Sequence, residues 1–244
     1  MQNDKEYWEK QFSNVIERKM KLAQASFFYK VFKTLLPIEL KNEINKSKFS
    51  CCDFGCGLGN FTDKLYEIFP SWQIYGVDYS QNAISYAKKH FPNVSFINTE
   101  LNKLKENFDI IISSNTLEHF SNPDEIIVKL LKHTKKFFIL LIPFEERELY
   151  KEHLFSFERE FFKDSIENFE LIYLKSIDLS YYFNTMWFGK QVLVVYKAKD
   201  YPLNFPKNTT NKNQYKLNLI DKINRSINLF RRNVYRQLRK FITK

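Results

Sequence analysis

Glycine is rare in this chain, and three of its five glycines stand within five consecutive residues, in the segment DFGCGLGN at residues 53–60. Glycine costs backbone entropy, so such a cluster indicates a loop that needs positive φ angles or that lets a ligand touch the main chain. A dinucleotide-binding fingerprint would need glycine in place of Asn60, and a Walker A loop would need a GK[ST] sequence, which is absent. The pattern D-x-G-x-G-x-G therefore predicts a ligand-binding loop of another kind.

Acidic residues follow the next two predicted strands. Asp78 comes 25 residues after Asp53, at the end of a strand, where a carboxylate can accept hydrogen bonds from two adjacent hydroxyls of a ligand. Helix capping is the alternative role for Asp78, although Ser80 is already placed to cap the next helix. Glu100 follows the third predicted strand, and a solvated surface acid explains it equally well.

The chain has four histidines, which differ in their expected surroundings. His90 and His133 come at the ends of predicted helices, where they favour the helix dipole. His119 lies in the segment FDIIISSNTLEHF at residues 108–120, just after a predicted strand, and a neutral imidazole there can accept a proton from a hydroxyl. His153, in the loop after the fifth predicted strand, is the second candidate base. Packing is the alternative role for His119, and an exposed loop position is the alternative for His153.

The three cysteines, Cys51, Cys52 and Cys56, all lie at the glycine segment. Neither a CxxC motif nor a neighbouring histidine cluster accompanies them, so zinc binding is not expected. We predict small side chains buried in a strand and its loop, and no metal site.

Strands and helices alternate through the middle of the chain, which predicts a doubly wound α/β fold. Apolar runs predict seven strands, at residues 49–54, 72–77, 94–97, 108–113, 137–142, 169–174 and 191–196. Helical spacing predicts helices at residues 4–35, 61–69, 81–90, 123–131 and 157–166. The last two strands follow each other directly, so we expect a mostly parallel sheet with an antiparallel edge.

Composition and charge divide the chain into four parts: an N-terminal helical cap at 1–40, the α/β domain at 41–199, a linker at 200–215 and a tail at 216–244. Residues 201–244 hold 11 Lys and Arg against one acid, so they carry the whole net charge of +10. Apolar residues recur every three or four positions in the tail, which predicts a basic amphipathic helix. The N-terminus is polar and no apolar run is long enough to span a membrane, so we expect a cytoplasmic protein.

The glycine loop, Asp78, Glu100 and the LEH sequence at 117–119 resemble, in order and spacing, the class I S-adenosylmethionine-dependent methyltransferases, over about residues 45–145. The resemblance implies a Rossmann-like methyltransferase fold and S-adenosyl-L-methionine as the cofactor. The cofactor contacts that it implies are Asp53, Gly55, Cys56, Gly57, Asn60, Asp78, Tyr79, Glu100, Leu101 and Asn115. Tyr7-Trp8 resembles the aromatic pairs that many such enzymes fold over the cofactor; helical spacing places Trp8 in the core, which leaves Tyr7 for that role.

The resemblance implies in-line transfer of a methyl group, in which the protein aligns the nucleophile and removes its proton. The sequence SNTL at residues 114–117 lacks the motif of amino-methylating DNA enzymes, the cysteines are misplaced for a cytosine-C5 enzyme, and no paired acids suit a metal-dependent catechol type. An O or N atom of a small molecule, or of a glycan or surface-polysaccharide precursor, remains as the acceptor. A non-catalytic binding or scaffold protein of this fold is one alternative, and an RNA methyltransferase that uses the basic tail is another.

The tail allows three kinds of partner. A basic amphipathic helix suits the inner face of an anionic membrane, where each Lys or Arg contributes about 1 kcal/mol. It also suits RNA phosphate, or docking on the chain's own body or on a partner. Because residues 1–200 carry equal numbers of basic and acidic residues, we favour peripheral membrane or partner docking over nucleic acid.

Overall fold

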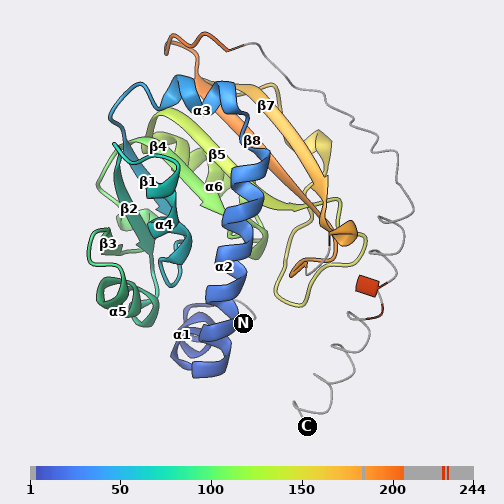
Figure 1. Cartoon of the computed structure of the whole chain (residues 1–244). Helices are drawn as coiled ribbons and strands as arrows, with labels where there is room; N and C mark the ends of the chain where they lie inside the picture. Colours follow the sequence, from blue (N-terminus) through green and yellow to red (C-terminus); the bar gives the residue numbers. More distant parts are fainter. Residues whose placement is uncertain (1–3, 183–184, 206–226, 229, 231–244) are drawn as a thin grey trace.

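An eight-stranded sheet forms the centre of the part of the chain that the computed structural model describes, which is residues 4–182, 185–205, 227, 228 and 230 (Figure 1). The strands are β1 (Ser50–Phe54), β2 (Gln73–Asp78), β3 (Ser95–Asn98), β4 (Phe108–Ser114), β5 (Thr134–Phe144), β6 (Ser165–Ile166), β7 (Phe169–Asp178) and β8 (Lys190–Ala198). The α-helices are α1 (Lys5–Ser13), α2 (Val15–Leu35), α3 (Ile38–Ile44), α4 (Asn60–Lys64), α5 (Gln81–His90) and α6 (Pro123–Lys132).

The strand order is β3-β2-β1-β4-β5-β8-β7-β6. The first five strands in this order pair in parallel, and the β5–β8, β8–β7 and β7–β6 pairs are antiparallel. The predicted α/β fold with a mostly parallel sheet and an antiparallel edge is therefore confirmed, but the sheet has eight strands where seven were predicted, because the short strand β6 pairs with β7. Strand β1 lies between β2 and β4, where the strand order reverses, and ligands of open α/β sheets bind beyond the strand ends at this place.

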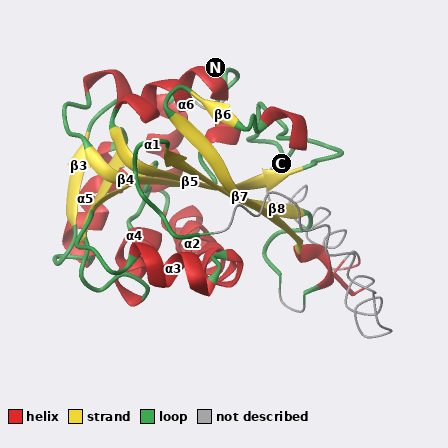
Figure 2. Cartoon of the chain, turned by 90° about the horizontal axis from the view of Figure 1, so that it is seen from above, coloured by secondary structure: helices red, strands yellow, loops and turns green. Residues whose placement is uncertain are grey.

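Helices cover both faces of the sheet (Figure 2). Ile110 and Ile112 of β4 pack in one apolar cluster with residues of α2 and α3, whereas Ile111 packs in another with residues of α6. This alternation follows from the two-residue period of a strand. In β5, residues 137–142 are fully buried, as expected of a central strand that is covered on both faces.

Three predicted helices differ from the structure. The helix predicted over 61–69 is the α-helix α4 only as far as Lys64, and a 3-10 turn, Leu65–Glu67, follows it. The prediction of a helix over 157–166 is wrong: this segment holds a 3-10 turn, Arg159–Phe161, and then β6, which pairs with β7. Its aromatic residues have a helix-like spacing, but they pack on one another in an irregular segment, where Phe157 and Phe162 are buried. The helical region 4–35 is divided at Asn14, whose side chain accepts hydrogen bonds from two main-chain N–H groups and so caps α2.

Most of the predicted linker and tail lies outside the described residues. Residues 200–205 are described, and the ring of Tyr201 lies 5.2 Å from that of Phe137 in β5. Within the predicted tail, the buried side chain of Asn228 donates hydrogen bonds to the main-chain oxygens of Ser180, at 2.9 Å, and Tyr182, at 2.7 Å. Among the described helices, none combines the length and the apolar character that crossing a membrane requires.

Candidate active site

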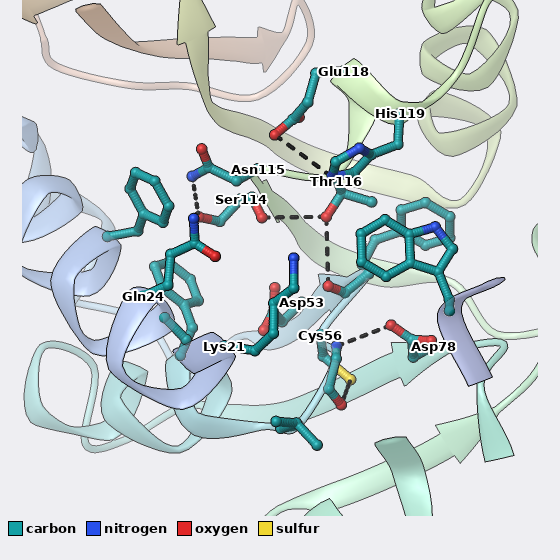
Figure 3. Close-up of a pocket in the computed structure, with 18 of the residues that line it drawn as sticks. Lys21, Gln24, Asp53, Cys56, Asp78, Ser114, Asn115, Thr116, Glu118 and His119 are labelled. Carbon is teal, nitrogen blue, oxygen red and sulfur yellow. Dashed lines mark hydrogen bonds and ion pairs between the residues drawn. The ribbon is translucent and has the colours of Figure 1, made fainter. Parts of the chain in front are cut away.

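A cavity lies beyond the carboxyl ends of β1, β2 and β4, where Figure 3 shows the glycine loop and Asp78 at one end and Glu118 and His119 at the other. Residues from the loops after β1, β2 and β3 form what we term the glycine side: Gly55, Cys56, Gly57, Asp78, Tyr79 and Leu101. Residues from α2, from the turn after β4 and from later loops form the histidine side: Lys21, Glu118, His119, Glu152, His153 and Trp187.

The glycine loop needs its glycines for two different reasons. Gly55, Gly57 and Gly59 have φ angles of +76°, +50° and +82°, in the left-handed region that side chains disfavour. A Cβ atom on Gly55 would lie 2.3 Å from the Thr116 side chain, so this position has no room for one. A Cβ atom on Gly57 would meet only the ring of Phe12, at 3.4 Å, so the main chain of Gly57 is open toward the cavity.

The carboxylate of Asp78 is fixed by the main chain and still faces the cavity. It accepts hydrogen bonds from the N–H of Gly57, at 2.9 Å, and from the N–H of Ser80, at 2.8 Å. Burial raises the pKa of Asp78 to about 6, although these hydrogen bonds favour the charged form. Ser80 is the N-cap of α5, as predicted. Each carboxylate oxygen can accept a further hydrogen bond, so Asp78 can receive two ligand hydroxyls.

Asp53 lies deeper in the same cavity. It is 2% exposed and accepts a hydrogen bond from the Thr62 hydroxyl at 2.6 Å. Burial raises the pKa of Asp53 to about 7. The three cysteines beside it are buried and free, as predicted, and burial raises the pKa of each thiol, which makes them inert.

Three residues predicted to contact the cofactor lie outside the lining of the cavity. The amide of Asn60 donates hydrogen bonds to the main-chain oxygen of Leu22 and to the hydroxyl of Ser26, so it fastens α4 to α2. The exposed carboxylate of Glu100 forms ion pairs with two lysines. The hydroxyl of Tyr7 donates to the Glu152 carboxylate at 2.7 Å, so Tyr7 supports the wall of the cavity without forming it.

The remaining predicted residues line the cavity. They are Asp53, Gly55, Cys56, Gly57, Asp78, Tyr79, Leu101, Asn115, His119 and His153. Asn115 has a positive φ angle of 50°, and its Oδ1 atom accepts a hydrogen bond from Gln191 of β8 at 2.9 Å. The tip of β4 is thereby fixed to the antiparallel part of the sheet.

The structure brings together the two histidines that the sequence singles out. Their ring centres lie 5.3 Å apart. The Nδ1 atom of His119 lies 2.8 Å from the main-chain oxygen of Glu152, and that of His153 lies 2.8 Å from the Glu146 carboxylate. The Nε2 atoms of both rings lie 4.0 Å from one carboxylate oxygen of Glu118.

Burial and neighbouring charges shift the pKa values of these three groups in different directions. Burial lowers the pKa of His119 to about 3 and raises that of Glu118 to about 7. Burial also acts to lower the pKa of His153, but the hydrogen bond with Glu146 and the charges of nearby carboxylates outweigh it, so this pKa is raised. His119 is therefore a neutral imidazole, whereas His153 takes up a proton more readily.

Known proteins resemble this chain in sequence and in fold. The methyltransferase domain family matches residues 45–170, which is more than half of the chain. The chain belongs to this family. Over 143 residues, the methyltransferase domain is 28% identical to the malonyl-[acyl-carrier protein] O-methyltransferase of Bacillus cereus, and the match covers 57% of this chain and 53% of that protein. The chain thus spans about half the length of this curated relative.

Solved methyltransferase structures share the fold. Magnesium protoporphyrin IX methyltransferase from Synechocystis PCC 6803, crystallised with SAH, is 16% identical with a TM-score of 0.55, over 76% of this chain and 88% of that one. The plantazolicin methyltransferase BpumL, in complex with a pentazolic desmethylPZN analogue and SAH, is 15% identical with a TM-score of 0.55, over 81% and 100% of the two chains. These likenesses establish the architecture of the methyltransferase domain.

Three side chains that line the cavity were not predicted to do so from the sequence: Trp8, Lys21 and Glu118. Trp8 was expected in the core, but it lines the cavity, and its ring lies 4.8 Å from that of His119. Lys21 pairs with Glu152 at 3.3 Å, although the two are far apart in the sequence. Glu118 belongs to the LEH sequence, and an acid directly after the buried Leu117 was the one local signal that could have identified it.

Proposed function

We propose that this methyltransferase domain transfers a methyl group from S-adenosyl-L-methionine to an oxygen of a small hydroxylated acceptor, such as a glycan precursor. The observation that carries the proposal is the meeting, in one cavity, of an open glycine loop with Asp78 and of a buried Glu118 with two histidines. The first group suits a nucleoside, and the second suits an acceptor that brings an O–H group.

The glycine side has the features that the cofactor needs. The open main chain of Gly57 allows close approach, and the carboxylate of Asp78 can accept hydrogen bonds from the two ribose hydroxyls. Tyr79 and Leu101 provide apolar surface for the adenine. The cofactor supplies the methyl group on a positively charged sulfonium, which is a good leaving group. The residues of this chain therefore need only orient the two reactants and remove a proton.

The histidine side is built to accept hydrogen bonds. A carbonyl or carboxylate can only accept, so the Nδ1 atoms of His119 and His153 donate, and each ring has a lone pair at its Nε2 atom when it is neutral. The Oε2 atom of Glu118 has no hydrogen-bond partner among the described residues. We place the acceptor oxygen against these atoms, where its O–H group is held and its proton is drawn away.

Binding and turnover test this proposal separately. Titration calorimetry with SAH should show one site, and a panel of hydroxylated and amine acceptors should release SAH from S-adenosylmethionine only with a hydroxylated member. Turnover with amines alone would overturn the assignment to oxygen. Binding without turnover on any acceptor would instead favour a non-catalytic binding protein of this fold, and absence of binding would overturn the whole proposal.

We further propose that the basic tail at 216–244 docks on the inner face of an anionic membrane. The nine basic residues of the tail, against one acid, support this proposal. Sedimentation with vesicles that contain anionic lipid should be lost when residues 206–244 are deleted. Unchanged sedimentation would contradict the proposal, and preferential capture by RNA at low salt would favour the nucleic-acid alternative.

A further inference from the structure

One oxygen and two nitrogens of the histidine side meet in the arrangement of a metal site. Glu118 and His119 come from the 3-10 turn after β4, and His153 comes from the loop after β5. Their ligand atoms all lie within 4.8 Å of one another. We propose that Glu118, His119 and His153 bind a divalent transition-metal ion, and that this ion receives the acceptor hydroxyl. This inference deepens the proposed function and rests on it for the role of the ion, but not for its binding.

Both histidines are oriented as metal ligands are. His119 donates its Nδ1 proton to the main-chain oxygen of Glu152, and His153 donates its Nδ1 proton to the Glu146 carboxylate. Metal-bound histidines almost always donate their other ring N–H to a carbonyl or carboxylate, which fixes the tautomer and the direction of the ring. In the neutral rings the Nε2 lone pairs are therefore available, and both lie 4.0 Å from Glu118 Oε1.

The burial of the Glu118 carboxylate, the third proposed ligand, supports the site independently. Glu118 is 1% exposed, and its Oε2 atom lacks a hydrogen-bond donor among the described residues. Buried carboxylate oxygens are rarely left in this way, because nothing compensates their loss of hydration. The other oxygen of this carboxylate, Oε1, lies 4.0 Å from the Nε2 atoms of both histidines. Three groups with ligand atoms this close together form a site that a cation can occupy.

The distances fit an ion after a small adjustment. Bonds of roughly 2.0–2.2 Å to each atom place tetrahedral ligands roughly 3.4 Å apart. The separations of 4.0 Å from Glu118 Oε1 must therefore close by about half an ångström, which rotation of the Glu118 side chain can supply. The two histidine nitrogens lie within 4.8 Å of each other, so their approach needs a rotation of the rings as well. Two imidazoles with one carboxylate are a donor set for Zn²⁺, Mn²⁺ or Fe²⁺ rather than for Mg²⁺, which prefers oxygen ligands.

An ion at this place explains how the acceptor is activated. Three protein ligands leave a position open toward the cavity, which all three residues line. A hydroxyl bound there has a lowered pKa and loses its proton to solvent. The oxygen then forms a bond to the methyl carbon as the carbon–sulfur bond breaks, and the sulfur leaves with the electron pair. One hydroxyl compound and one sulfonium yield one methyl ether, one thioether and one proton.

Calorimetry on the full chain, stripped with a chelator, tests the inference with ZnCl₂, MnCl₂ and MgCl₂. We expect one equivalent of Zn²⁺ to bind, far more tightly than Mg²⁺. Glu118→Gln and His153→Asn should each weaken Zn²⁺ binding by about tenfold or more. His90→Asn is the matched control, because His90 also has its Nδ1 atom 2.8 Å from a main-chain oxygen but is exposed and far from the cluster in the sequence. It should bind Zn²⁺ as the unaltered protein does.

Two further measurements test which residues bind the metal and whether each variant is folded. Cobalt substitution should give a spectrum without thiolate charge-transfer bands, which excludes the cysteines as ligands. SAH titration of the same samples reports whether each variant is folded. Failure of the unaltered protein to bind Zn²⁺ while SAH binds overturns the metal site, as does Zn²⁺ binding that survives in both variants. Failure of SAH to bind overturns the proposed function and leaves the Zn²⁺ measurement to stand alone.

Discussion

The two sides of the cavity are built by different means. On the glycine side, neighbouring strand ends are joined by main-chain hydrogen bonds: the N–H groups of Gly55 and Cys56 both donate to the Val77 carbonyl, and that of Gly57 donates to Asp78. On the histidine side, side chains from distant segments hold one another, as Glu152 does by accepting from Tyr7 and Lys21. The main-chain contacts of the glycine side fix the shape of the ligand that it accepts. The side chains of the histidine side can be substituted without disturbing the sheet.

The largest effect is expected from Asp78→Ala on the glycine side. The change removes two charged acceptors, each contributing roughly 1.5–3 kcal/mol to a hydroxyl ligand, so SAH affinity should fall roughly a hundredfold or more. Glu100→Ala is the control, because Glu100 is exposed and pairs only with surface lysines among the described residues. Its SAH affinity should change by about twofold or less. Equal losses in both variants, measured by calorimetry, would contradict the role assigned to Asp78.

Glycine substitutions test whether main-chain geometry shapes this side. Gly55→Ala should lower the free energy of unfolding by about 2–3 kcal/mol, because its Cβ atom would overlap the Thr116 side chain at a φ of +76°. Gly57→Ala has only the strain of the left-handed backbone to overcome, about 1 kcal/mol. Urea unfolding measures both values. A larger loss in Gly57→Ala than in Gly55→Ala would reverse the comparison.

Lowering the pH should weaken SAH binding on the glycine side, because Asp78 becomes protonated. Burial raises its pKa to about 6, and the ionised form accepts the ligand hydroxyls, so binding is complete well above pH 6 and is lost as the pH falls. SAH affinity should fall about tenfold per pH unit below 6. Asp78→Asn carries no titrating group at this position and should show no such slope between pH 5 and 8. An unaltered protein whose SAH affinity is flat over this range would refute the assignment.

The smallest effect is expected on the histidine side, from Tyr7→Phe. Removing the hydroxyl takes one hydrogen bond of 2.7 Å from Glu152, and we expect about 1 kcal/mol less stability, measured by thermal unfolding. SAH affinity should not change, because Tyr7 lies outside the cavity lining. A loss of SAH affinity comparable to that of Asp78→Ala would show that the two sides are not independent.

Local signals explain why so much of the fold was predictable. The fully apolar run of β5, the Pro123 at the start of α6 and the Ser80 cap of α5 each express a short-range rule, and each prediction is confirmed. The segment 157–166 failed because an irregular aromatic cluster and a helix can share one spacing of apolar residues. The pairing of β6 with β7, between residues three and five positions apart, distinguishes the two structures, and the spacing of apolar residues does not reveal it.

In the candidate site, too, the residues with a local sequence signal were predictable and the others were not. Gly57 and Asp78 could be located because each lies directly after a strand, and parallel strand ends meet at one edge of a sheet. The prediction placed Trp8 in the core and Tyr7 over the cofactor, but Trp8 lines the cavity and Tyr7 does not, because helical spacing does not reveal which face of a helix covers a cavity. Lys21 carries no signal at all among the many lysines of the chain, and only the packing of α2 gives it a partner.

Helix α1 is attached to both sides at once. The Glu9 carboxylate accepts hydrogen bonds from the main-chain N–H groups of Gln81 and Asn82 at the start of α5, and Tyr7, two residues earlier, bonds to Glu152 on the opposite wall. Trp8 and Phe12 of this helix line the cavity, so a molecule bound there lies against α1. For the proposed methyl transfer, we expect release of the thioether product, rather than the transfer step, to limit turnover.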